Sequence, residues 1–129
     1  MKDLHEFITE KALTGLCCSQ IVLAVGMEYC GLDNPELVKA ARGLCGGVHG
    51  GFTCGTLTGA ACLISLICEP PESVSLIRNL TEWFTQRFAS DSCASILTAD
   101  PSLAEEHCLP LVAETLEKTL EILDECGRR

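Results

Sequence analysis

The sequence lacks the features that would direct the chain to export or into a membrane. Its first fifteen residues, MKDLHEFITEKALTG, mix acidic and basic side chains and contain no apolar segment like that of a secretory signal peptide. The longest largely apolar run, residues 57–68, is well short of the roughly 20 residues that cross a bilayer. We therefore expect a cytoplasmic protein without a membrane span, in a compartment where thiols stay reduced.

Basic residues are scarce. Nine Lys and Arg stand against eighteen Asp and Glu, which gives a formal net charge of −9. Proteins that bind phosphate backbones need a basic face, so we expect no nucleic-acid partner.

Several common catalytic and metal-binding motifs are also missing. The chain has no Gly-x-Ser-x-Gly elbow, no phosphate-binding loop with Lys-Ser/Thr, and no Cys-x-x-Cys pair. Hydrolases of the elbow type, nucleotide-binding folds, zinc ribbons and thioredoxin-type dithiols therefore have no local signature here. The sequence leaves open whether the protein is an enzyme.

Cysteine and glycine are plentiful instead. The chain has ten cysteines, and seven of its eleven glycines lie in GLCGGVHGGFTCGTLTG, residues 43–59. Glycine adopts positive φ and permits close backbone approach, so this stretch is expected to be an irregular loop. The helical pattern starts directly after Cys54, where unpaired N–H groups and the helix dipole favour the thiolate. We expect the glycines to leave the Cys54 sulfur uncovered, and Cys54 to be the most reactive of the ten thiols.

Most of the remaining chain has apolar residues at helical spacing. Helices are expected over residues 3–14, 16–30, 35–44, 55–68, 72–89 and 100–126. Asn34-Pro35 and Asp100-Pro101 are typical helix starts. Pro110 is expected to kink the last helix, and residues 90–100 are expected to be a break with a short turn around Cys93. The sequence thus predicts one domain over residues 1–129, an all-α bundle of five or six helices with a glycine-rich loop.

Two of these helices, at residues 16–30 and 55–68, are apolar on nearly every side and are expected to cross in the core. Gly59 is predicted to lie at their contact, because a small residue lets another backbone come close. An acidic chain of this size must cover its apolar helices, so we also expect a symmetric homodimer.

Many of the cysteines fit ordinary core packing, because free cysteine is among the most buried residue types. The cysteines assigned to packing are Cys17, Cys30, Cys62, Cys68 and Cys126. Cys45 shares the glycine loop with Cys54 and is left undecided.

The segment Cys54-Gly55-Thr56-Leu57-Thr58-Gly59 resembles the Cys-Gly-Ala-x-x-Gly core of the C-GCAxxG-C-C family of putative redox-active proteins. The similarity extends over about residues 15–123. Cys18 opens an apolar helix where the family has its first cysteine, Cys93 follows an aromatic-rich helix, and Cys108 stands at the head of the last one. Thr56 departs from the family pattern, which has alanine there. The resemblance implies that the functional set is Cys18, Cys54, Cys93 and Cys108.

These four cysteines fit two kinds of site. A thiol–disulfide or electron-transfer site would serve a redox partner protein, and its preferred pairs are Cys18 with Cys54 and Cys93 with Cys108. A metal site would use the same four thiolates to bind zinc or an iron–sulfur cluster. The expected cofactor contacts are Gly55, Gly59 and His49. A structural or adaptor protein with inert cysteines is the third alternative; the redox site, which needs no bound cofactor, ranks first.

Overall fold

The computed structural model describes residues 3–125, and the chain is helical there. The α-helices are α1 (Leu4–Leu13), α2 (Cys18–Tyr29), α3 (Pro35–Ala40), α4 (Gly55–Ile67), α5 (Glu72–Phe88), α6 (Cys93–Ala99), α7 (Ser102–Glu105) and α8 (Leu109–Glu125). A 3₁₀ turn, η1 (Ala41–Leu44), and a π turn, η2 (Gly47–Gly51), occupy the glycine-rich region. The all-α prediction is confirmed, but within the described residues there are eight α-helices rather than five or six.

Of the two start signals read from the sequence, Asn34-Pro35 acts as expected, whereas after Asp100-Pro101 the helix begins at Ser102, with Pro101 as its N-cap and no side-chain cap hydrogen bond. Asp3 supplies a further cap. The Asp3 side chain accepts a hydrogen bond of 3.0 Å from the Glu6 N–H and caps α1. Asn34 accepts one of 3.2 Å from the Leu37 N–H, with Pro35 as the first residue of α3. Local chemistry therefore sets where these two helices begin.

The extra helices arise where the sequence predicted a break and a kink. Residues 93–99 form α6, capped by Ser92, instead of an irregular break. The predicted last helix is divided into α7 and α8, because His107 and Cys108 adopt left-handed φ angles of 54° and 60° between them. Pro110 lies in the first turn of α8, where its missing N–H loses no hydrogen bond, so it does not kink the helix. The predicted packing of Cys126 falls outside the described residues.

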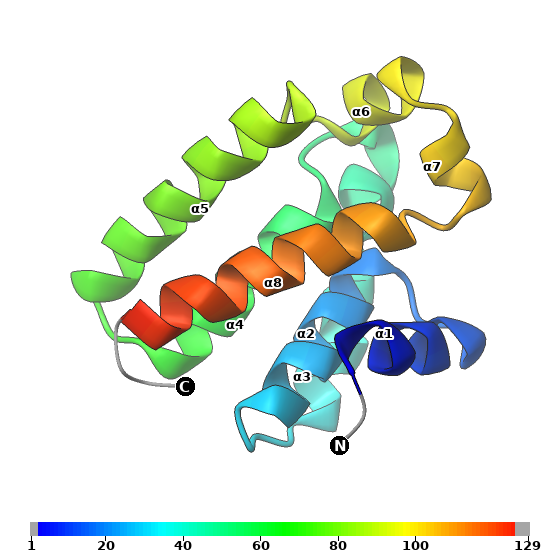
Figure 1. Ribbon diagram of the computed structural model, residues 1–129. Coiled ribbons are helices and arrows are strands. Elements are labelled where there is room, and N and C mark those ends of the chain that lie inside the picture. The colour runs from blue at the N-terminus through cyan, green and yellow to red at the C-terminus, as the bar shows by residue number, and fades with distance from the viewer. Residues whose placement is uncertain (1–2, 126–129) are drawn as a thin grey trace.

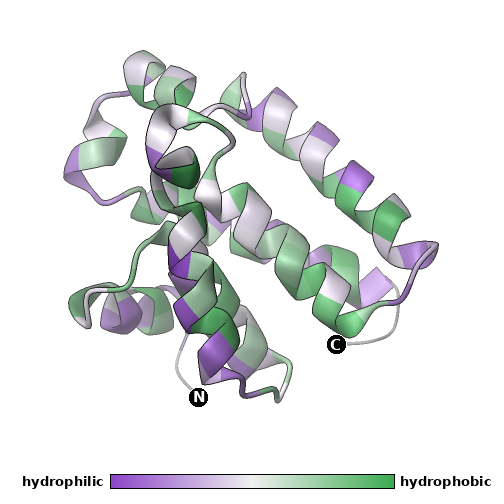
Figure 2. Ribbon diagram, turned by 180° about the vertical axis from the view of Figure 1, so that it is seen from behind, coloured by the Kyte–Doolittle hydropathy of each residue, from purple (hydrophilic) through white to green (hydrophobic). Residues whose placement is uncertain are grey.

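The core forms around the crossing of α2 and α4, which make the most extensive helix contact of the fold, with α1, α5 and α8 packed around them (Figure 1). In Figure 2, α4 is predominantly hydrophobic, whereas α5 alternates along its length between hydrophilic and hydrophobic residues. A Cβ atom on Gly59 would lie 2.6 Å from Val22 Cγ1 and 2.8 Å from the Ser19 carbonyl oxygen. The predicted place of Gly59 at the crossing is confirmed.

The homodimer was expected because α2 needs a cover, and other helices of the same chain provide that cover. Its apolar surface packs against α1, α4 and α8 of the same chain, and eight of its twelve residues are buried. The need to cover α2 therefore no longer calls for a second copy. Across residues 3–125, no helix combines the length and the apolarity needed to cross a bilayer.

Replacing Gly59 with alanine is expected to lower the free energy of unfolding by about 1–3 kcal/mol, because the added methyl group would overlap the α2 backbone. Urea denaturation measures the change. Gly43→Ala is the matched control, since a Cβ at Gly43 meets nothing within 4 Å. Equal urea midpoints for the two variants would show that α4 can move away from α2 at little cost.

Candidate thiol site

The four cysteines implied by the family resemblance all lie at helix starts. Cys18 and Cys93 are the first residues of α2 and α6, Cys54 is the N-cap of α4, and Cys108 directly precedes α8. In Figure 1 the starts of α2, α6 and α8 lie in the half of the molecule that also holds α7. Segments far apart in the sequence therefore share this half of the molecule.

Backbone hydrogen bonds hold Cys54 and Cys93 in neighbouring segments. The Cys54 N–H donates to the Asp91 carbonyl at 2.8 Å, and the Cys93 N–H donates to the Phe52 carbonyl at 2.6 Å. Between these bonds lies an isolated antiparallel bridge that joins Thr53 to residue 92. The segments before α4 and α6 are thus paired like a very short ribbon, and each delivers one cysteine.

Gly55 brings Cys18 close to the start of α4. A Cβ atom at Gly55 would lie 3.1 Å from Cys18 Sγ and 2.7 Å from the Leu44 carbonyl oxygen. Only glycine lets these two groups approach the backbone so closely. The Cys18 sulfur therefore packs beside the residue that follows Cys54.

Electrostatic effects connect all four thiols. Burial raises the pKa of Cys93, and negative charge on Cys18 raises it further. The pKa of Cys108 rises to about 12, first because of burial and then because of the charges of Cys18, Cys54 and Cys93. Such effects fall off with distance and with screening, so Cys18, Cys54 and Cys93 each lie within electrostatic reach of Cys108.

The prediction that the Cys54 sulfur is uncovered is wrong, since only 6% of the residue is exposed. Burial raises its pKa, and the charge on Cys18 acts in the same direction. The N–H groups of Thr56 and Leu57 lower the pKa, as expected at a helix start, but burial outweighs them. The glycines allow the loop to close tightly around Cys54 rather than leave it open.

Thr56, the departure from the family pattern, lies in the first turn of α4 next to Cys54. Its hydroxyl is fully buried and has no hydrogen-bond partner among residues 3–125 while Cys54 is a thiol. The same hydroxyl lowers the pKa of Cys54, so it is placed to donate to the thiolate. Alanine at this position would lack that donor.

The structure contains a disulfide that the sequence did not predict, between Cys17 and Cys45, with a Cα–Cα distance of 6.2 Å. The sequence assigned Cys17 to packing and left Cys45 undecided. The preferred pairs, Cys18 with Cys54 and Cys93 with Cys108, are not bonded, and all four of these residues are free thiols. No spacing rule points to the observed bond, because its partners are 28 residues apart. The only sign in the sequence that Cys17 has a role besides packing is its position directly before Cys18.

The remaining predicted residues have clear positions. Cys68 is buried in the core, and Cys30 and Cys62 pack against it, as expected. Gly59 packs against Val22 and Ser19 of α2, and its contact with a cofactor stays a prediction. His49 is exposed on the loop, where its Nε2 donates to the Arg42 carbonyl at 3.1 Å.

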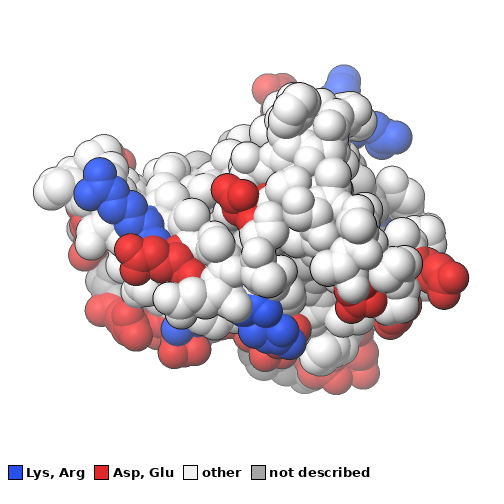
Figure 3. Space-filling view, turned by 90° about the horizontal axis from the view of Figure 1, so that it is seen from above, with Lys and Arg blue, Asp and Glu red and all other residues white. Residues whose placement is uncertain are grey.

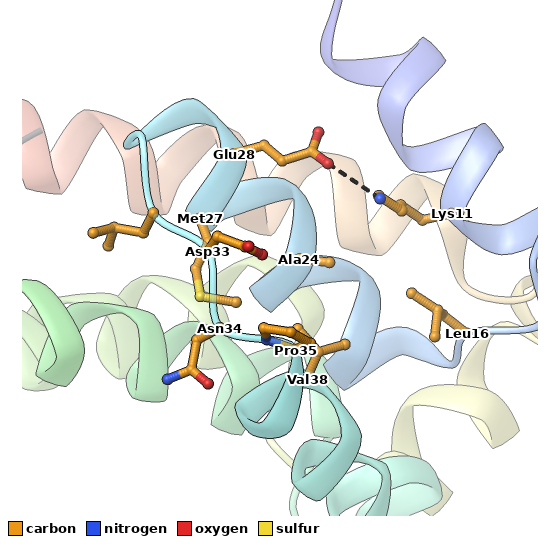
Figure 4. A pocket seen from close by; sticks show the side chains of 10 residues that line it. Lys11, Leu16, Ala24, Met27, Glu28, Asp33, Asn34, Pro35 and Val38 are labelled. Atoms are coloured by element: carbon orange, nitrogen blue, oxygen red, sulfur yellow. Dashed lines mark ion pairs between the residues drawn. The ribbon is translucent and has the colours of Figure 1, made fainter.

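No three His, Cys, Asp or Glu side chains among residues 3–125 are grouped closely enough to hold a metal ion. Zinc or an iron–sulfur cluster at the four cysteines stays a prediction from the sequence. The cavity in Figure 4, of about 230 Å³, lies between α1, α2 and α3 beside the Lys11–Glu28 ion pair. Its lining contains no cysteine, so it is not part of the thiol site.

Fold and site together define a small, cysteine-rich, all-helical protein with four free cysteines at helix starts. The sequence model of a family described as "Putative redox-active protein (C_GCAxxG_C_C)" matches residues 16–122. The chain belongs to this family. No curated protein and no solved structure matches the chain.

Proposed function

We propose that Cys18, Cys54, Cys93 and Cys108 form one thiol–disulfide site that exchanges electrons with a partner protein in the cytoplasm. The observation that carries the proposal is the packing of the helix starts: Cys18 Sγ lies beside Gly55, which follows Cys54, and the segments of Cys54 and Cys93 are hydrogen-bonded to each other. The pKa of Cys108, raised first by burial and then by the charges of the other three cysteines, supports the same grouping. Membership of a family described as redox-active supports the same conclusion.

Cys18 is the attacking thiol of this site. It is half-exposed at the start of α2. Burial, and then the charges of neighbouring thiols, raise the pKa of Cys54, Cys93 and Cys108, so these three stay protonated near neutral pH.

Cys54 resolves the intermediate, because the Cys18 sulfur packs beside Gly55. The Cys18 thiolate attacks a disulfide of the partner, forms a mixed disulfide and releases one partner thiolate. Cys54 then loses its proton, attacks the Cys18 sulfur and displaces the second partner thiolate. The partner disulfide gains two electrons and two protons, and the protein becomes a Cys18–Cys54 disulfide. Cys93 and Cys108 supply a second pair of reducing equivalents.

The surface suits a partner bound through apolar contacts. On the loop before Cys54, Val48 and Phe52 are 56% and 69% exposed. Seen from above the view of Figure 1, most of the molecule is uncharged, and acidic side chains gather toward the lower edge of that view (Figure 3). A second copy of the chain is an alternative occupant of such a surface, which light scattering tests directly.

In protein whose Cys17–Cys45 disulfide is intact, replacing Cys18 with serine is expected to slow the reaction with a small disulfide such as oxidised glutathione at least about tenfold, because Cys54, Cys93 and Cys108 have raised pKa values. Cys54→Ser should instead accumulate the Cys18 mixed disulfide, which mass spectrometry of the intact protein and its peptides detects. Cys62→Ser, a half-buried cysteine within α4, is the matched control and should react like the wild type.

Two results would contradict the proposal. One is a Cys18→Ser protein that reacts as fast as the control. The other is an anaerobically purified protein that is coloured and contains iron and sulfide, or that contains zinc, because the four thiolates would then be metal ligands.

A further inference from the structure

The Cys17–Cys45 pair lies outside the four-cysteine set and has a chemistry of its own. Its Cα–Cα distance of 6.2 Å is within the span of a disulfide. Cys17 is the half-exposed N-cap of α2, and Cys45, 7% exposed, directly follows η1. The pair therefore links the start of α2 to the beginning of the glycine loop.

We propose that Cys17 and Cys45 are a second, reversible thiol–disulfide couple, whose oxidation anchors the glycine loop (residues 46–51) beside the four-cysteine site. The couple itself does not depend on the function proposed for the four cysteines. Only the expected effect of the Cys17–Cys45 bond on the reaction rate of Cys18 rests on that proposed function.

The bond lies next to the contact that brings the four-cysteine site together. Cys17 precedes Cys18, and Cys45 follows Leu44. The Cys18 sulfur and the Leu44 carbonyl are the two groups that meet at Gly55. A covalent link one residue from each of these groups joins the two segments to each other beside the start of α4.

Ser19 keeps the two segments aligned even without the bond. Its buried hydroxyl donates to the Ala41 carbonyl at 2.7 Å, and the same oxygen lies 3.1 Å from Cys45 Sγ. Cys45 thus stays close to Cys17 in the reduced protein, which favours re-formation of the disulfide.

The unequal exposure of the two sulfurs sets the order of the reaction. A small external disulfide reaches Cys17 first, so the Cys17 thiolate attacks it and releases one small thiolate. Cys45 then loses its proton, attacks the Cys17 sulfur and displaces the second small thiolate. The protein loses two electrons and two protons, which the external disulfide takes up as two thiols. Two small thiols reverse the reaction.

The glycine loop beyond Cys45 depends on such an anchor. Val48 and His49 both have φ of 58°, a left-handed conformation that costs non-glycine residues energy and persists only where the surroundings impose it. The hydrogen bonds that restrain this loop run from the Phe52 N–H to Gly47, from His49 to Arg42 and from the Ser92 hydroxyl to Gly51. Breaking the disulfide removes its covalent attachment to α2, so the loop becomes more mobile.

Equilibration in graded mixtures of reduced and oxidised glutathione, followed by differential alkylation and peptide mass spectrometry, tests the couple. Cys17 and Cys45 are expected to change from alkylated to bonded together, with one midpoint. Cys45→Ser should leave Cys17 alkylated or glutathionylated at every ratio. Independent changes of the two residues, or no change of either across the series, would overturn the proposal.

Hydrogen exchange of the amides in residues 46–51 tests the anchoring. Exchange is expected to be faster in the reduced wild type than in the oxidised one, and the Cys17→Ser/Cys45→Ser protein should match the reduced form. Cys62→Ser is the control and should show the same oxidised–reduced difference as the wild type. Identical exchange in both redox states would refute the anchoring.

The two proposals fail separately. Reversible oxidation is read at Cys17 and Cys45, whereas the four-cysteine function is read from the mixed disulfide at Cys18. A more mobile loop leaves Cys18 easier to reach. The Cys18 reaction with oxidised glutathione is therefore expected to be faster in the double variant than in the oxidised wild type. Equal rates would restrict the anchoring to the loop and would overturn the stated link to Cys18.

Discussion

Cys108 is expected to react with iodoacetamide at pH 8 roughly 50 times more slowly in the folded, reduced protein than in the same protein unfolded in urea. Its pKa is about 12, against an ordinary value of 9.0. The thiolate fraction falls about 1,000-fold for such a shift, and the greater basicity of the thiolate returns roughly 20-fold in nucleophilicity. Peptide mass spectrometry of timed, quenched samples measures the rate at this one residue.

The pH dependence of the same reaction provides a stricter test. Because the raised pKa keeps Cys108 protonated, its rate in the folded protein should rise about tenfold for each pH unit well below the pKa. In the unfolded protein the rise should end near pH 9. A folded-state plateau below pH 10 would contradict the raised pKa of Cys108.

The cause of the shift can be separated from burial. Negative charge on Cys18 is the largest contribution to the Cys108 pKa after burial, so Cys18→Ser should lower that pKa and speed the labelling of Cys108. Cys62 is not among the groups that act on Cys108, and Cys62→Ser should leave the rate unchanged. If both variants label alike, Cys18 and Cys108 do not share a site.

Replacing Phe84 with alanine is expected to lower the free energy of unfolding by about 3–5 kcal/mol. Phe84 is fully buried on α5, and its ring centroid lies 4.8 Å from that of Phe88. The substitution removes this aromatic contact and leaves a cavity where α5 packs against α4 and α8. Urea denaturation followed by circular dichroism measures the loss.

Phe52→Ala makes the same chemical change at a position that is 69% exposed. The free energy of unfolding of this control should change by no more than about 0.5 kcal/mol. A Phe84→Ala midpoint equal to that of the control would mean that α5 is not held by its buried face.

The sequence predicted the secondary structure correctly where interactions between residues close in the chain determine it. The side chains of Asp3 and Asn34 cap helices a few residues away, and the apolar patterns of α2 and α4 mark them as the central pair. The place of Gly59 followed from the same reasoning, because close helix contacts need small residues. The sequence predicted a break where α6 forms and did not separate α7 from α8; α6 and α7 are seven and four residues long. Helices that short are marginal by themselves and form only where tertiary contacts stabilise them.

The sequence by itself determined an all-helical chain and its family, and through the family resemblance it named four cysteines as the expected site. The tertiary structure decided how those cysteines behave. Cys54 is buried because Leu44 and Cys18 close around Gly55, and its pKa is therefore raised despite the helix start. Cys17 pairs with Cys45 across 28 residues because η1 returns to the beginning of α2. Burial and proximity depend on which distant segments pack together, and no spacing rule within one segment contains that information.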